Sequence, residues 1–270
     1  MIDRFHYVSV RRAYDQSSLR GSESRGNLNR FHHATVYKEM SMIMADKKSK
    51  LIVIDGLDGS GKATQSRLLC ERLCEMGYKA RTISFPDYDS DSSALVKMYL
   101  GGKLGSSPDD VNAYAASTFY AVDRVASYIN TWRKDCETYD YIIADRYTTS
   151  NIIHQMAKVP ESERDSYIDW LFDFEYNRLE LPAPDQVIFL DVDPAISQKL
   201  IYGRYGGDES KKDIHESDVA YLLRCRSSAV YAIEHLDWAR IDCTHDGEMR
   251  TIEEINDDII SLVLNGDTNR

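Results

Sequence analysis

Seven consecutive residues match the phosphate-binding pattern G-x-x-x-x-G-K: Gly56, Leu57, Asp58, Gly59, Ser60, Gly61 and Lys62. Glycines let the backbone turn tightly and bring its N–H groups close to phosphate oxygens, and the N-terminus of a following helix adds partial positive charge. Lys62 supplies a full charge for the β- and γ-phosphates of a nucleotide. A glycine-rich turn with an unrelated lysine is the alternative. It does not explain why an apolar run at 51–54 precedes the loop and a helical pattern follows it.

The residue after the lysine departs from this pattern. A Ser or Thr hydroxyl normally stands there and binds Mg²⁺, whereas this chain has Ala63. Thr64 comes next, but one step along a helix turns a side chain by about 100°. We expect the backbone N–H groups of the loop at 56–64 to bind a nucleotide nonetheless, but the sequence leaves open how the metal is held.

A second group of candidate residues follows the strand predicted at 139–144. Asp145 and Arg146 end that strand, at the sheet edge where the phosphate loop should lie. Asp145 can hold Mg²⁺, directly or through water, and Arg146 can bind a phosphate through two parallel hydrogen bonds. The alternative is a buried ion pair, which is costly to desolvate. Asn151, His154 and Gln155 follow on a short predicted helix, where a lone histidine is more often structural than functional.

The elements that must position these residues alternate between strand and helix patterns. We predict strands at 51–54, 79–85, 139–144, 187–191 and 238–242, and helices at 62–76, 107–134, 161–180, 214–235 and near 252–262, with a shorter one before 101 and another opened by Asp193. We expect the segment 161–180, acidic and aromatic, to be a surface helix. This alternation predicts one three-layer α/β domain with a mostly parallel sheet.

The helix predicted at 107–134 begins at an N-cap serine, Ser107. One apolar stripe along it should face the core: Val111, Ala115, Thr118, Val122, Val125, Ile129 and Trp132. Tyr120 and Arg124 lie away from this stripe. From the helix alone, a solvated face is the simpler interpretation of these two residues.

The ends of the chain and one loop differ from the rest. Residues 1–45 show no periodicity, and we expect a disordered extension, from either a mis-set start or a targeting segment, before a single domain at 46–270. A glycine-rich loop at about 202–213 carries Arg204, Lys211 and Lys212. It is either a mobile lid that closes over phosphates or an ordinary solvated loop.

Composition limits the partners. The net charge of −11 over 270 residues argues against general binding to nucleic acid or acidic membranes. No apolar run approaches the roughly 18 residues of a membrane span. The five cysteines contain no C-x-x-C pair, so we expect reduced thiols in a cytoplasmic protein.

Together these motifs resemble the thymidylate kinase family of P-loop nucleoside monophosphate kinases. The resemblance rests on IDGLDGSGKATQ at 54–65, FP at 85–86, FYAVDR at 119–124, DRYTTSNIIHQ at 145–155 and the basic loop, and it spans about residues 50–262. It implies a three-layer α/β/α fold with a mostly parallel five-stranded sheet and a short lid. It also implies transfer of the γ-phosphoryl group of ATP to dTMP in dTTP biosynthesis, with Mg²⁺, by a homodimer.

The resemblance assigns a role to each candidate residue. The loop 56–64 would bind ATP, and the catalytic groups would be Lys62, Arg146, Arg204 and Asp145, with Asp145 serving the metal. The dTMP site would contain Asp58 at the 3′-hydroxyl, Tyr120 stacked on thymine, Arg124 at the thymine carbonyl, Asn151 at N3, Arg146 at the phosphate, and His154 and Gln155 beside them. These roles replace the solvated-face interpretation of Tyr120 and Arg124.

Three further departures from the family pattern bear on function. Tyr88 stands where many members have an arginine that reaches the acceptor phosphate. His154 replaces a tyrosine or phenylalanine that lies under the sugar and helps to reject a 2′-hydroxyl. Gly59 replaces an arginine found in some members, whose charge Arg204, Lys211 or Lys212 could supply from the lid, with Arg204 preferred for its planar fork.

Two other functions remain open at this point. One is a related kinase that acts on a nucleoside or another monophosphate, although Arg124 and Asn151 favour a pyrimidine with a carbonyl at position 4. The other is a nucleotide-binding module that has lost catalysis, with Ala63 marking the lost metal ligand.

Overall fold

The central strand of the fold is the apolar run before the phosphate loop. In the computed structural model, which describes residues 49–204, 206–208 and 213–268, this run forms β1 (Lys50–Gly56). Leu51 and Val53 are buried against one set of helices, and Ile52 and Ile54 are buried against another. A strand buried on both faces needs helices on both sides of the sheet, as the apolar run predicts.

Five parallel strands form the sheet in the order β2-β3-β1-β4-β5. The other four are β2 (Ala80–Ser84), β3 (Tyr141–Asp145), β4 (Gln186–Asp191) and β5 (Ala239–Asp242). The predicted parallel sheet is confirmed. Because β1 lies between β3 and β4, the strand order reverses there, and the carboxyl ends of these strands open the crevice in which such sheets bind ligands.

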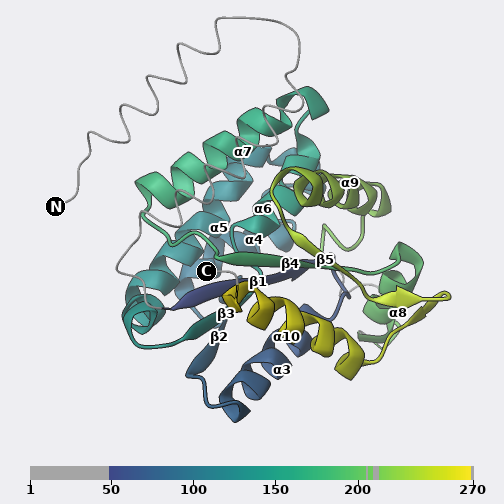
Figure 1. The fold of residues 1–270 in the computed structure, drawn as a ribbon. Helices are drawn as coiled ribbons and strands as arrows, with labels where there is room; N and C mark the ends of the chain where they lie inside the picture. The colour runs from purple at the N-terminus through teal and green to yellow at the C-terminus, as the bar shows by residue number, and fades with distance from the viewer. Residues whose placement is uncertain (1–48, 205, 209–212, 269–270) are drawn as a thin grey trace, which may run out of the picture.

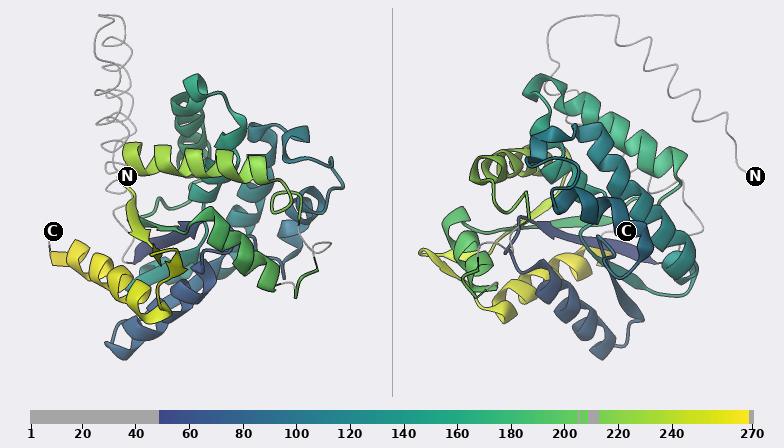
Figure 2. Two further views of the ribbon diagram at one scale, coloured as in Figure 1. Left: turned by 90° about the vertical axis from the view of Figure 1, so that its right-hand side faces the viewer. Right: turned by 180° about the vertical axis from the view of Figure 1, so that it is seen from behind.

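Helices cover both faces and make the three predicted layers (Figures 1 and 2). One face carries α3 (Lys62–Glu75) and α10 (Ile252–Thr268). The other face carries α5 (Ala113–Ser127), α6 (Thr149–His154), α7 (Arg164–Phe172) and α9 (Val219–His235), with α4 (Ala94–Leu100) beside α5. Two further elements are α8 (Pro194–Arg204), which is the helix predicted after Asp193, and a small hairpin of β6 (Thr244–His245) with β7 (Glu248–Met249). The sequence did not predict the hairpin.

The helix predicted at 107–134 is divided, and its predicted core stripe is only partly buried: Trp132 lies in the core and Val125 packs against it, whereas two other members are exposed. Ser107 caps only a short 3₁₀ turn, because Val111 is extended, and Asn112 caps the new helix α5. Val122 and Ile129 of the predicted core stripe are 51% and 60% exposed, whereas Arg124 is 1% exposed. The polar side of α5 faces inward because it lines the site described below, so the solvated-face interpretation was wrong.

Two other helix predictions need correction. The segment 161–180 is not a single surface helix but an amphipathic one in several parts: Ser166 and Asp169 of α7 are exposed, whereas Tyr167, Ile168 and Leu171 are fully buried, and a π-helical segment, Asp173–Arg178, follows. The helix predicted from residue 214 begins at Val219, where Asp218 caps it by accepting a hydrogen bond from the Tyr221 amide.

Some predictions concern residues outside the described part of the chain. These are the extension at 1–45, the part of the lid at 205 and 209–212, which includes Lys211 and Lys212, and the side chain of Arg204. Within the described residues, no helix is both long and apolar enough to cross a membrane.

Candidate active site

The phosphate loop joins β1 to α3 through three glycines with backbone angles that other residues rarely adopt. Gly59 and Gly61 have φ of +79° and +86°. A Cβ at Gly56 would lie 2.6 Å from Ser60 Oγ, and one at Gly59 would lie 2.8 Å from the carbonyl oxygen of Ser197. The loop therefore packs directly on α8, and this contact explains why no side chain such as arginine stands at position 59.

Lys62 lies inside the loop that it serves. Its Nζ donates to the Leu57 carbonyl at 2.7 Å and lies 3.4 Å from Ser60 Oγ. The side chain is buried, and burial together with the charge of Arg146 lowers the pKa of Lys62 to about 8. A phosphate in the loop would give this ammonium group a better partner than a neutral carbonyl.

Arg146 brings a second cation to the same place. It follows β3 with φ of +65°, a strained angle for a non-glycine residue and one that is common at functional sites. Its Nη2 pairs with an Asp58 carboxylate oxygen, and its Nη1 lies 3.2 Å from His154 Nε2. Burial acts to raise the pKa of Asp58, but Arg146 and Lys62 outweigh it and hold that pKa well below its usual range.

Two carboxylates flank these cations and differ in how fully they are bonded. Asp55 accepts hydrogen bonds from the hydroxyls of Thr149 and Ser150 and from the Gly56 amide, so its oxygens are occupied by the protein. Asp145 lies opposite Ile54 in the sheet, and its buried Oδ1 has no hydrogen-bond partner among the described residues. Burial raises the pKa of Asp145.

An adjoining pocket is lined by all seven residues predicted to bind the acceptor nucleotide. Its lining includes Asp58, Tyr120, Arg124, Arg146, Asn151, His154 and Gln155. We call the part around Arg146, which pairs with Asp58, the cationic end, and the part around Tyr120, Arg124 and Asn151, where Arg124 and Asn151 share a partner in Glu175, the far end. One pocket thus combines a flat ring and two hydrogen-bonding side chains with a phosphate-binding charge, as a nucleoside monophosphate requires.

Glu175 holds the far end of this pocket together, and the sequence analysis missed it. It is fully buried and accepts hydrogen bonds from Arg124, Thr148 and Asn151. The only signal in the sequence is that Glu175 follows Leu171 by four residues, on the apolar side of a segment that was interpreted as a surface helix.

A pair of histidines also lines this pocket. His154 and His215 stack with ring centroids 5.7 Å apart, and His215 Nε2 lies 2.9 Å from the Tyr99 hydroxyl. Burial and the charge of Arg146 lower the pKa of His154 to about 3, so its imidazole is neutral. His215, also buried, was not predicted as a site residue.

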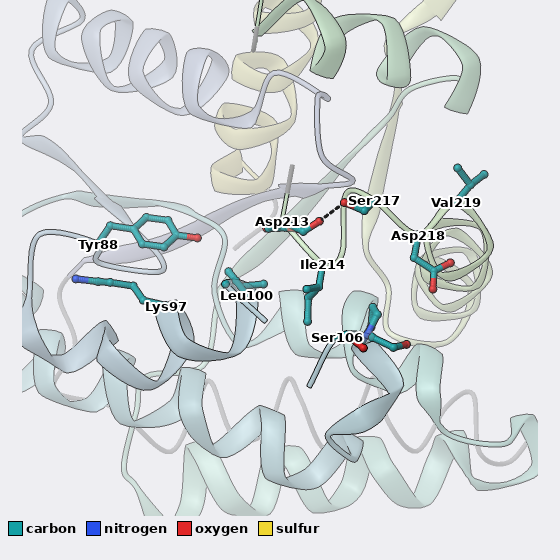
Figure 3. Close-up of a pocket in the computed structure, with 12 residues that line it drawn as sticks. Tyr88, Lys97, Leu100, Ser106, Asp213, Ile214, Ser217, Asp218 and Val219 are labelled. Carbon is teal, nitrogen blue, oxygen red and sulfur yellow. Dashed lines mark hydrogen bonds between the residues drawn. The ribbon is translucent and has the colours of Figure 1, made fainter. Parts of the chain in front are cut away.

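A wider groove of about 1000 Å³ adjoins the pocket and shares Tyr88, Leu100 and Asp213 with it (Figure 3). Figure 3 shows Tyr88 and Lys97 on one side, Asp213 near the centre, and Asp218 on the other side. Tyr88 is half exposed at this junction. Burial of its hydroxyl raises the pKa of Tyr88 to about 12. Tyr88 lies between the groove and the pocket, where its side chain could contact a bound phosphate, but this side chain brings no charge.

Two loop residues lie at the start of α3. Ala63 is exposed and Thr64 is half-buried. Of the proposed catalytic set, Lys62, Arg146 and Asp145 come together, whereas the side chain of Arg204 lies outside the described residues.

Comparison with known proteins places this geometry in a family. The family model for thymidylate kinase matches residues 54–255. The thymidylate kinase of Mycobacterium tuberculosis is 33% identical over 184 residues, which cover 67% of this chain and 84% of that protein. The human thymidylate kinase is 27% identical over 216 residues, covering 80% and 90%.

Solved structures agree on the fold. The thymidylate kinase of Candida albicans superposes with a TM-score of 0.60 at 21% identity, covering 83% of this chain and 94% of that one. Since the family model spans well over half of the 270 residues and includes the phosphate loop, β3 and α5, the chain belongs to the thymidylate kinase family.

Proposed function

We propose that this chain transfers the γ-phosphoryl group of ATP to dTMP, with the donor phosphates held at residues 56–64 and the acceptor in the pocket beside them. The observation that carries this proposal is the meeting of two cations, Lys62 and Arg146, with a pocket whose far end presents Tyr120, Arg124 and Asn151. The acceptor is already an anionic phosphate, so positioning and charge neutralisation account for most of the catalysis.

Each end of the pocket has a separate task in this proposal. Arg146 binds the dTMP phosphate in exchange for its present partner, Asp58, which is then free to accept a hydrogen bond from the sugar 3′-hydroxyl. Tyr120 stacks on the base, and Arg124 and Asn151 bind its polar edge. The neutral His154 and the buried Gln155 lie beside the sugar and base.

We propose Asp145 as the carboxylate that serves Mg²⁺. Its Oδ1 is a buried acceptor without a partner among the described residues, which fits a metal or a metal-bound water, whereas Asp55 is fully bonded. Bound Mg²⁺ would neutralise charge on the transferring phosphates. Arg204, at the end of α8, is proposed as the lid cation.

The direct test is ADP release by the full chain with ATP and Mg²⁺, run in parallel with dTMP, dUMP, UMP, dCMP and AMP. We expect turnover to be fastest on dTMP. Equal or faster turnover on another monophosphate would assign a related kinase. Binding of ATP and dTMP without ADP release from any acceptor would assign a module that has lost catalysis.

Two further properties are part of the proposal. Val122 of α5 and Ile129 of the π-helical segment that continues it, Tyr128–Trp132, are exposed apolar residues, and they support a homodimer formed through this helical face. All five cysteines are free thiols, which supports a reducing, cytoplasmic location.

A further inference from the structure

The Glu175 carboxylate is saturated by donors from the base end of the pocket. Its Oε2 accepts from Arg124 Nε at 2.7 Å and from Thr148 Oγ1 at 2.8 Å. Its Oε1 accepts from Arg124 Nη2 and from Asn151 Nδ2, the latter at 3.1 Å. Glu175 and Arg124 are both nearly inaccessible to solvent, so water does not compete for these bonds.

These bonds fix the direction of the Asn151 amide. Its Nδ2 faces two groups that can only accept, the Glu175 carboxylate and the Ser117 carbonyl at 3.5 Å. A turned amide would place Oδ1 against both oxygens, which is repulsive. The nitrogen is therefore directed away from the pocket, and Oδ1 is the atom that Asn151 offers to a ligand.

The pocket thus presents an acceptor, Asn151 Oδ1, near a donor, the Arg124 guanidinium. Thymine and uracil match this pair, with an N–H at position 3 next to a carbonyl at position 4. Cytosine has the opposite pattern, a bare N3 next to an amino group, and would leave buried polar groups unpaired.

We propose that Glu175 is a specificity-determining positioning residue, which holds the Asn151 amide so that the pocket selects dTMP over dCMP. The proposal deepens the function proposed above and rests on it. Glu175 does not touch the nucleotide itself. It acts through Asn151 and Arg124.

The test compares kcat/KM for dTMP and dCMP in the wild type and in Glu175→Gln. In the variant, the new amide can donate to Asn151 Oδ1 and allow Asn151 to turn. We expect the dTMP-to-dCMP ratio to fall at least about tenfold, the size of one unpaired buried hydrogen-bonding group. Glu180→Gln, an exposed change in the same segment, is the matched control and should leave the ratio unchanged.

A folded Glu175→Gln protein that loses activity equally on both acceptors would overturn the proposal, because Glu175 would then be merely structural. Should Glu175→Gln not fold, Glu175→Asp keeps the counter-charge for Arg124 but moves the carboxylate away from Asn151. The same drop in ratio is expected there, and an unchanged ratio would again overturn the proposal.

A second, independent test uses the wild type alone and needs no variant. N3-methyl-dTMP lacks the N–H that Asn151 Oδ1 should accept, and we expect its kcat/KM to fall on the order of 100-fold. Wild-type enzyme that uses dCMP or N3-methyl-dTMP as well as dTMP would overturn the inference while leaving kinase activity intact. An absence of turnover on every acceptor would contradict the proposed function instead, and Kd values of dTMP and dCMP would then measure base selectivity directly.

Discussion

At the scale of single residues, Lys62 is buried at a position where keeping its ammonium group charged costs free energy. Lys62 is buried against a carbonyl, with another cation nearby. We predict that Lys62→Met lowers kcat with dTMP by at least about 100- to 1000-fold, since it removes a preorganised charge on the transferring phosphates. The measurement is steady-state ADP release.

The same variant should be at least as stable as the wild type at pH 7, because it no longer buries an ammonium group. Its Tm, measured without nucleotide, should be equal or higher. A Lys62→Met protein with normal turnover would contradict the mechanism, and one with a markedly lower Tm would contradict the buried-charge argument.

The lowered pKa of Lys62 also predicts a pH dependence. Below pH about 8 the ligand-free side chain is protonated and can bind phosphates, whereas above about 8 it is increasingly neutral. Because kcat/KM reports the free enzyme, kcat/KM for ATP should fall about tenfold per pH unit above this value. His154, with a pKa of about 3, should add no change between pH 6 and 9. A profile that stays flat to pH 9.5 would show that Lys62 keeps its proton.

The site residues that could be predicted from the sequence are those whose function is indicated by their immediate neighbours in the chain. Lys62 and the glycines belong to one contiguous motif, and Arg146 directly ends a strand. Arg124 was misinterpreted on helix periodicity alone, because its partner Glu175 lies 51 residues away and joins it only in the fold. A buried charge cannot be told from a solvated one until both members of the pair are placed.

At the scale of elements, the phosphate loop depends on its contact with α8. Gly59 and Gly61 both have positive φ, but only Gly59 has a backbone atom, the Ser197 oxygen, in the path of a Cβ. We predict that Gly61→Ala costs about 1–2 kcal/mol for its backbone angle alone. Gly59→Ala should cost more, because α8 must also move.

Urea unfolding of both glycine variants, without nucleotide, measures this difference. The Gly61→Ala variant is the matched control, since it carries the same type of strain without the clash. Equal losses in the two variants would show that the loop does not pack on α8 as described.

The ends of a helix could be predicted where local sequence signals agree. They could not be predicted where tertiary contacts determine where the helix starts or stops. The stop of α3 follows from Gly77, which has φ of +92° and donates its amide hydrogen to the Cys74 carbonyl. The start of α5 did not follow, because Ser107 is also a good cap and only the extended Val111 shows that its turn ends early. The inward face of α7 was hidden because acidic residues surround its apolar positions.

At the scale of the whole molecule, the parallel sheet was the most predictable feature. Short apolar runs with helices between them allow few other arrangements. The surface was the least predictable, because periodicity finds an apolar stripe without showing what the stripe packs against. The periodicity assigns Val122 and Ile129 to the core, but they lie on the outside of α5 and of the π-helical segment that follows it, while Arg124 lies inside.

This exposed stripe gives the last prediction. Two copies related by a twofold axis would each bury Val122 and Ile129 against the other, and a self-complementary helix face is a common way to form such an interface. We predict that Val122→Glu with Ile129→Glu converts a dimer to a monomer, because charged side chains would face one another without water. Leu223→Glu, an exposed change on α9, is the control and should leave the dimer intact. Light scattering after size-exclusion chromatography gives the masses.

A wild type that is already monomeric at micromolar concentration, or a double variant that stays dimeric, would show that α5 does not form the interface. Because α5 also carries Tyr120 and Arg124 on its inner side, loss of the partner should raise KM for dTMP more than KM for ATP.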